Sequence, residues 1–174
     1  MSRISKQGTL GFTAVEIAVG VAILGALLAA AIPTFIRTVH SSRFVEATDG
    51  LAKLGKQATS FAEGRPPADA FPPSAALTPS APPRGTLQID PPGTWDSPTW
   101  QALAFRPANE GEPHAFSFGF DSGHASGRSF FAAHAHADLD GDGAVSTFEV
   151  RGHASVDEPF AIIEPGMYVE SEVE

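Results

Sequence analysis

The chain has 174 residues, no cysteine and a formal net charge of −9 at pH 7. The negative charge is concentrated in the later part, because from residue 38 onward eight Lys and Arg stand against nineteen Asp and Glu. An acidic surface repels phosphates, which argues against non-specific binding to nucleic acid. The length is enough for one domain with its own core, and no disulfide can brace that core.

An uninterrupted apolar stretch lies near the beginning of the chain. Twenty residues without a formal charge, 17–36, separate Glu16 from Arg37. A helix rises about 1.5 Å per residue, so this length covers the roughly 30 Å hydrocarbon core of a bilayer. A carboxylate at such a boundary is costly and indicates a function or a partner. Arg3 and Lys6, which precede the stretch, predict a cytoplasmic N-terminus and an exported C-terminal part.

The junction in front of this stretch carries a compact motif, Gly11-Phe12-Thr13-Ala14-Val15-Glu16. Followed by an apolar helix, it resembles the class III signal of type IV pilins and pseudopilins. The resemblance implies that a prepilin peptidase removes residues 1–11 and that the new amine of Phe12 is methylated. It also implies that Glu16 pairs with the N-terminal amine of a neighbouring subunit, and such charges offset each other's desolvation only when close. Gly25 and Pro33 match as well, and in similar pilins the segment between them loses its helical structure in the filament.

The apolar stretch has two simpler interpretations. One is an ordinary transmembrane anchor that carries a chance glutamate. The other is a secretory signal peptide, which is disfavoured because the run exceeds an h-region of about 7–15 residues and lacks an A-x-A-like exit. The resemblance divides the chain into a leader (1–11), a membrane or filament-core half-helix (12–37), an amphipathic half-helix (38–63) and a head (64–174).

The amphipathic half-helix has one apolar stripe. Its members recur at spacings of three and four and are Phe44, Ala47, Leu51, Leu54, Ala58 and Phe61. The run is too short for a coiled-coil seam, so we expect the stripe to lie against the head. Gly50 and Gly55 each cost about 0.8–1 kcal/mol in a helix relative to Ala, and they indicate either close packing or a bend.

The segment from residue 64 to residue 93 contains nine prolines and predicts an extended, polyproline-like loop. Leu87 and Ile89 near its end are compatible with a short strand. The following Ser97-Pro98 pair is typical of a helix start, with the serine as N-cap and the proline at the first helical position. Trp95 and Trp100 are expected to pack over one end of the core.

Alternating apolar residues predict the strands of the head. Phe116, Phe118 and Phe120 point to one side of the first strand. The four expected strands are 114–120, 129–137, 146–152 and 160–163. We expect a glycine-rich turn at 121–128 and an exposed acidic tail from Tyr168 onward. The predicted fold class is therefore α+β and type IV pilin-like, with a long N-terminal helix packed on an antiparallel four-stranded sheet.

An acidic loop between the second and third expected strands follows the twelve-residue calcium-loop pattern of EF-hands. Its predicted ligands are Asp138, Asp140, Asp142, the carbonyl of Ala144, Ser146 through a water, and Glu149. Carboxylates at positions 1, 3, 5 and 12 surround one point, and the glycine at position 6 allows the sharp turn. Strands rather than helices are expected to flank the loop, so it would be an EF-hand-like loop outside an EF-hand. A tight acidic hairpin without Ca²⁺ is the alternative, because the sequence D-G-D-G also favours a turn.

Two histidines of the second expected strand, His134 and His136, share one face because they lie two residues apart. A transition-metal site there would need a third ligand supplied by the fold, so a solvated strand face is the favoured interpretation. The sequence contains no serine-nucleophile elbow and no phosphate-binding glycine loop beside a strand. It therefore gives no indication of an enzyme.

These observations favour a structural subunit that polymerises into a type IV pilus-like filament. A pseudopilin of a type II secretion system is the runner-up, because it would carry the same signal and a similarly acidic head. A membrane-anchored, calcium-dependent binding module is the alternative from another class. The expected location is the bacterial inner membrane, followed by an extracellular pilus or a periplasmic pseudopilus.

Overall fold

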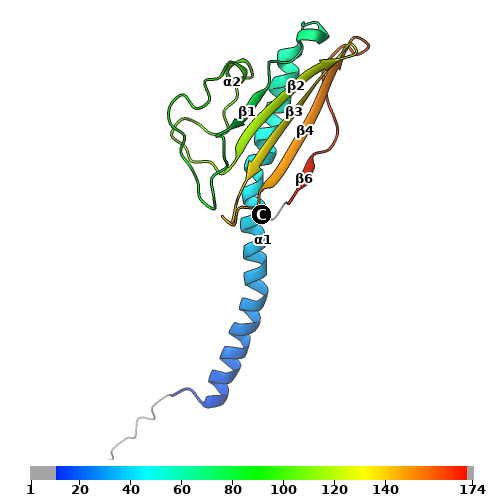
Figure 1. Ribbon diagram of the computed structural model, residues 1–174. Coiled ribbons are helices and arrows are strands. Elements are labelled where there is room, and N and C mark those ends of the chain that lie inside the picture. The colour runs from blue at the N-terminus through cyan, green and yellow to red at the C-terminus, as the bar shows by residue number, and fades with distance from the viewer. Residues whose placement is uncertain (1–10, 172–174) are drawn as a thin grey trace, which may run out of the picture. The chain divides into compact units, whose positions relative to one another are not determined.

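The computed structural model describes residues 11–171, with the backbone alone for residues 34 and 36–43 (Figure 1). Apart from Gly11, the predicted leader lies outside the described residues, as does the end of the acidic tail. The elements are α1 (Ala14–Ala62), η1 (Pro67–Asp69), β1 (Ala75–Thr78), α2 (Pro98–Ala102), β2 (Ser117–Ala125), β3 (Arg128–Ala137), β4 (Ser146–Ser155), β5 (Ile162–Ile163) and β6 (Tyr168–Glu170). The chain divides into two compact units, 1–40 and 41–174, and α1 contributes to both.

The second unit contains one antiparallel sheet. Its strand order is β1-β2-β3-β4-β5, and β6 pairs with β4 beside β5 (Figure 1). The α+β class and the antiparallel meander are confirmed, but the sheet has six strands rather than the predicted four. The two additional strands, β1 and β6, are short and come from segments that were expected to be a loop and a free tail. Each obtains its hydrogen bonds from a longer neighbour, so neither needs a strong apolar alternation of its own.

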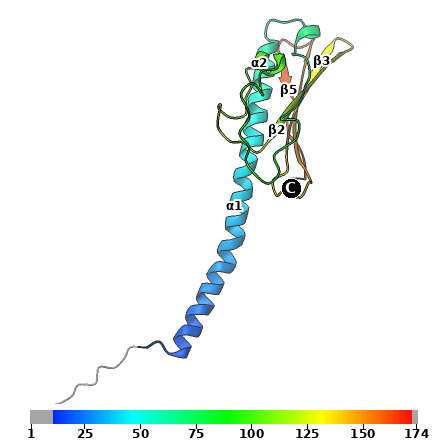
Figure 2. The ribbon, with the colours of Figure 1, turned by 60° about the vertical axis from the view of Figure 1, so that its left-hand side comes forward.

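The core lies between one face of this sheet and the part of α1 in the second unit, as Figure 2 shows from the side. Leu51 and Leu54 of the predicted stripe are fully buried, in the same cluster as Phe116, Phe118 and Phe120. Period 3.6 on the helix and period 2 on the strand thus place both apolar sets on one interface. The predictions of the stripe and of the phenylalanine face are confirmed.

The glycine-rich segment 121–128 is not a long turn. Strand β2 continues to Ala125, and the hairpin closes over only Ser126 and Gly127. Both residues have positive φ, 52° and 77°, which is the geometry that two-residue hairpin turns require. Gly123 remains in the strand because its missing side chain leaves room for the ring of Phe130 on β3.

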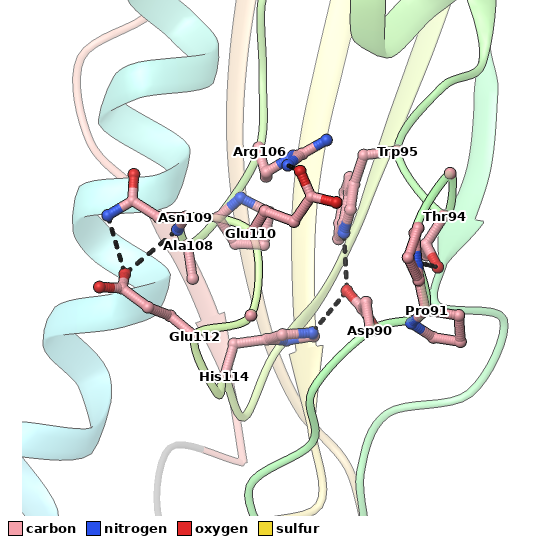
Figure 3. Close-up of a pocket in the computed structure, with 14 residues that line it drawn as sticks. Asp90, Pro91, Thr94, Trp95, Arg106, Ala108, Asn109, Glu110, Glu112 and His114 are labelled. Atoms are coloured by element: carbon pink, nitrogen blue, oxygen red, sulfur yellow. Dashed lines mark hydrogen bonds and ion pairs between the residues drawn. The ribbon is translucent and has the colours of Figure 1, made fainter.

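The proline-rich segment is attached to the rest of the unit by polar contacts. Asp90 accepts a hydrogen bond from Nε1 of Trp95 at 2.6 Å, and the same oxygen lies 2.7 Å from Nε2 of the buried His114 (Figure 3). The expected strand around Leu87 and Ile89 is absent from this part of the described chain. In its place an isolated bridge joins Gln88 to His114.

The short helix α2 forms as predicted, with the hydroxyl of Ser97 accepting from the backbone N–H of Trp100. Trp100 is 1% exposed, and its Nε1 donates to the hydroxyl of Thr78 on β1 at 3.0 Å. Trp95 packs against the Trp100 ring with a centroid separation of 5.4 Å. The expectation that both tryptophans cover one end of the core is confirmed.

Candidate functional site

Residues 11–13 have no regular secondary structure, and the helix begins at Ala14. Thr13 stands at the N-cap position, where its hydroxyl accepts a hydrogen bond from the backbone N–H of Glu16 at 3.3 Å. In return, Oε2 of Glu16 accepts from the backbone N–H and the hydroxyl of Thr13, each at 2.8 Å. This reciprocal pair is a capping box. The Thr-x-x-Glu spacing is the signature of this motif, so the capping box could have been predicted from the sequence.

The apolar run after Glu16 is long and apolar enough to cross a membrane. The span Ala14–Pro33 has 20 residues and a mean hydropathy of 2.4. Its large side chains are exposed in the first unit, and Phe12 in front of it is 85% exposed. Gly25 and Pro33 both lie within continuous helix in this single chain. Loss of helical structure between them therefore stays a prediction for a packed filament.

The acidic loop brings three of the four predicted carboxylate ligands together. One oxygen from each of Asp138, Asp140 and Asp142 lies within 4.8 Å of the others. The loop curls because Asp138 accepts from the N–H of Gly141 at 2.8 Å, and Asp140 accepts from the N–H of Asp142 at 3.1 Å. These bonds are turn chemistry that needs no ion, so they are equally compatible with the acidic-hairpin alternative.

Asp138 differs from its two neighbours because it is only 2% exposed. Its Oδ2 atom has no hydrogen-bond partner among the described residues, and Nε of Arg84 lies 3.9 Å away. The backbone carbonyl of Asp138 accepts from the N–H of Gly85 at 2.7 Å, which joins the proline-rich segment to the loop. A buried carboxylate oxygen is costly unless a hydrogen bond or a cation compensates it, and here the compensation is the long ion pair with the exposed Arg84.

Glu149, the fourth predicted carboxylate, is not part of this group. It alternates with the core residues of β4, so it lies on the outer face of the sheet, opposite His134 in the register. Its carboxylate forms an ion pair with Arg151. On the same face, burial and then the neighbouring His134 lower the pKa of His136. Of the other predicted ligands, Ser146 is buried at the start of β4 and Ala144 follows the loop.

No protein-family model, no curated protein and no solved structure matches the chain. Two features of the chain itself are the candidates for a functional site. The first is the N-terminal segment, in which Glu16 lies in the first turn of an exposed apolar helix. The second is the acidic loop, in which Asp138 keeps a buried carboxylate oxygen without a hydrogen bond.

Proposed function

We propose that this protein is a structural subunit of a type IV pilus-like filament. In this proposal a prepilin peptidase cleaves after Gly11, and the mature subunits polymerise through the apolar part of α1. The observation that carries the proposal is the position of Glu16. It lies in the first turn of an exposed apolar helix and would be the fifth residue of a chain that begins at Phe12. A head with a core of its own can stay folded while that helix changes its surroundings.

The assembly mechanism follows from the energetics of the apolar helix. Lipid tails are as apolar as leucine, so moving the helix from a bilayer into a filament core gains little hydrophobic energy. Close packing and the charge pair then decide whether subunits join and in which register. An ionised carboxylate in hydrocarbon costs about 2.5–3.5 kcal/mol or more, and pairing with the Phe12 amine of a neighbour offsets that cost.

Two alternative functions also depend on the N-terminal helix. A type II secretion pseudopilin would polymerise in the same way but remain in the periplasm. A membrane-anchored binding module would insert through the same helix and never polymerise. The three functions therefore differ in whether subunits assemble and where the assemblies are found.

The test is the pair of variants Glu16→Gln and Glu63→Gln in cells that produce the protein. Both change a glutamate that is exposed in the structure, but only the first stands at the predicted junction. We expect the mature wild-type chain to begin at Phe12 and to appear in filaments sheared from the cells. We expect Glu16→Gln to insert in the membrane normally and to be missing from filaments, while Glu63→Gln assembles.

Three outcomes separate the hypotheses. A mature N-terminus other than Phe12 contradicts processing as a prepilin. Filaments recovered only from the envelope favour the secretion pseudopilus. Full function of Glu16→Gln, with a monomeric wild-type chain in every fraction, favours the anchored module.

A second proposal concerns the acidic loop, which we infer to bind Ca²⁺. The buried Oδ2 of Asp138 supports it, because this oxygen lacks a hydrogen bond and Ca²⁺ takes six to eight oxygen ligands. Asp138, Asp140 and Asp142 would hold the ion together with the carbonyl of Ala144. When bound, Ca²⁺ would neutralise the clustered carboxylates.

The measurement is the melting temperature of the full-length chain in detergent micelles, with millimolar Ca²⁺ or with a chelator. Binding only to the folded state stabilises by about 2.7 kcal/mol at a hundredfold excess over Kd. We expect Ca²⁺ to raise the melting temperature of the wild-type chain and of the control Asp157→Asn. We expect no rise for Asp140→Asn. The same melting temperature with and without Ca²⁺ in the wild-type chain would remove this proposal.

A further inference from the structure

The outer face of the sheet, opposite the phenylalanine core, carries a histidine pair on its central strand. His134 and His136 of β3 alternate with Ala133, Ala135 and Ala137, which are fully buried on the inner face. The two imidazole centroids are 5.2 Å apart. Two histidines at this spacing on a strand present their rings to the same side, as chelating pairs do.

Strand β2 leaves room for the first of these rings. Gly119 is opposite His134 in the β2–β3 register, and a Cβ atom built on this glycine would overlap Nε2 of His134. The imidazole therefore lies across the backbone of β2, with Nε2 above Gly119. Any larger residue at position 119 would displace the ring, so the glycine leaves the space that this nitrogen occupies.

The other ring nitrogens face oxygen atoms. Nδ1 of His136 lies 3.0 Å from the hydroxyl of Thr147 on β4, and Nδ1 of His134 lies 3.7 Å from Oδ2 of Asp121 on β2. The Thr147 hydroxyl can accept a hydrogen bond from Nδ1–H of His136, and the same ring also hydrogen-bonds the backbone of Ser146, whereas 3.7 Å is too long for a hydrogen bond between His134 and Asp121. With hydrogen on Nδ1, His136 keeps a lone pair on Nε2, the arrangement in which an outer hydroxyl orients a metal-binding imidazole.

A buried hydroxyl completes the arrangement. Ser117 is opposite His136 in the register and lies two residues before Gly119, so it faces the same side as the two rings. It is 0% exposed, and its Oγ atom has no hydrogen-bond partner among the described residues. An orphaned buried hydroxyl costs about 1–3 kcal/mol, and a water bound to a metal ion beside it would remove that cost.

We propose that Nε2 of His134 and Nε2 of His136 bind a divalent transition-metal ion of the Zn²⁺ class on the outer face of the sheet. The described residues place no third protein ligand beside the pair, so water would complete the coordination and would exchange a hydrogen bond with Oγ of Ser117. Asp121 on β2, 3.7 Å from Nδ1 of His134, is a positioning residue for that ring, whereas the carboxylate of Glu149 on β4 is paired with Arg151. Imidazole nitrogen suits Zn²⁺, Cu²⁺ and Ni²⁺, whereas Ca²⁺ requires oxygen, so this site and the acidic loop select different ions.

The decisive experiment is a calorimetric titration of the metal-free, full-length chain in detergent micelles with ZnCl₂. Millimolar Ca²⁺ is present throughout, so that the carboxylates of the acidic loop are occupied or screened. We expect one saturable site per chain, with Zn²⁺ perturbing the ring resonances of His134 and His136. Each of His134→Gln and His136→Gln weakens binding at least tenfold, and Asp121→Asn weakens it less.

The matched control is His124→Gln, a histidine of β2 whose Nδ1 contacts Ser129 instead. This variant should bind Zn²⁺ as the wild-type chain does. The proposal is overturned if the wild-type chain shows no saturable binding. It is also overturned if the double variant His134→Gln/His136→Gln, with an unchanged near-UV circular dichroism spectrum, binds Zn²⁺ as tightly as the wild type.

Discussion

Two glycines of the amphipathic half-helix have different surroundings. A Cβ built on Gly50 would come within 2.5 Å of Cε1 and Cζ of Phe118, which is fully buried in the core. A Cβ built on Gly55 would meet Cδ1 of Ile163 at 3.1 Å, and Ile163 is 40% exposed. The sequence left close packing and a bend open, and the structure favours close packing at Gly50. The pair offers a matched test of that packing.

The two alanine substitutions should act in opposite directions. Both gain about 0.8–1 kcal/mol of helix propensity. At Gly50 the contact is about 1 Å closer than normal carbon separation, and forcing extra carbon into a packed core costs about 1–3 kcal/mol. Gly50→Ala should therefore destabilise by up to about 2 kcal/mol. Gly55→Ala should stabilise by about 0.5–1 kcal/mol, because the side chain of Ile163 can move outward.

The assay is thermal unfolding of both full-length variants in the same detergent, followed by near-UV circular dichroism. A difference of at least about 1 kcal/mol corresponds to roughly 3–5 °C for a unit of this size, with Gly55→Ala the more stable. Equal melting temperatures, or a higher one for Gly50→Ala, would refute the conclusion that the ring of Phe118 fills the space beside the helix. The wild-type chain should fall between the two variants.

Two further predictions concern β4 and the loop that follows it. Gly152→Ala would drive a Cβ into the ring of Phe131 and the backbone carbonyl of Ile162, so we expect a loss of more than about 3 kcal/mol in the unfolding free energy, measured by urea denaturation. The hydrogen bond from His153 lowers the pKa of Glu158 below its ordinary value of 4.5, so its stabilisation is present above pH 4.5 and is lost as the pH falls further. Glu158→Gln should therefore melt below the wild-type chain at pH 6, and the gap should close as the pH falls toward 3; a constant gap would contradict this assignment.

Much of the fold could be predicted because its signals are periodic. The helix stripe that contains Leu51 and the strand that contains Phe118 are amphipathic, and each periodicity states which side is buried. The start of α2 could be predicted because Ser97 and Pro98 occupy positions with a definite backbone role. These signals depend on residues only a few positions apart, so they can be recognised without knowing which distant parts of the chain are in contact.

The parts that could not be predicted depend on distant partners. Strand β1 forms because β2 offers it hydrogen bonds, and the glycines of β2 tolerate a strand because Phe130 fills the space above Gly123. Glu149 stands at the twelfth position of the calcium-loop pattern, but it lies in strand β4. The alternation of β4 turns its side chain to the outer face of the sheet, beside His134 and away from the three aspartates.

The capping box explains why glutamine is the informative replacement for Glu16. Glutamine also serves at the third helical position of a capping box, so Glu16→Gln keeps the bond to the backbone N–H of Thr13 and removes only the charge. A helix that still begins at Ala14 but no longer enters filaments would assign assembly to the carboxylate–amine pair. If Glu16→Gln forms filaments normally, Glu16 has only the local role that the single chain already shows, which is to cap the N-terminus of α1.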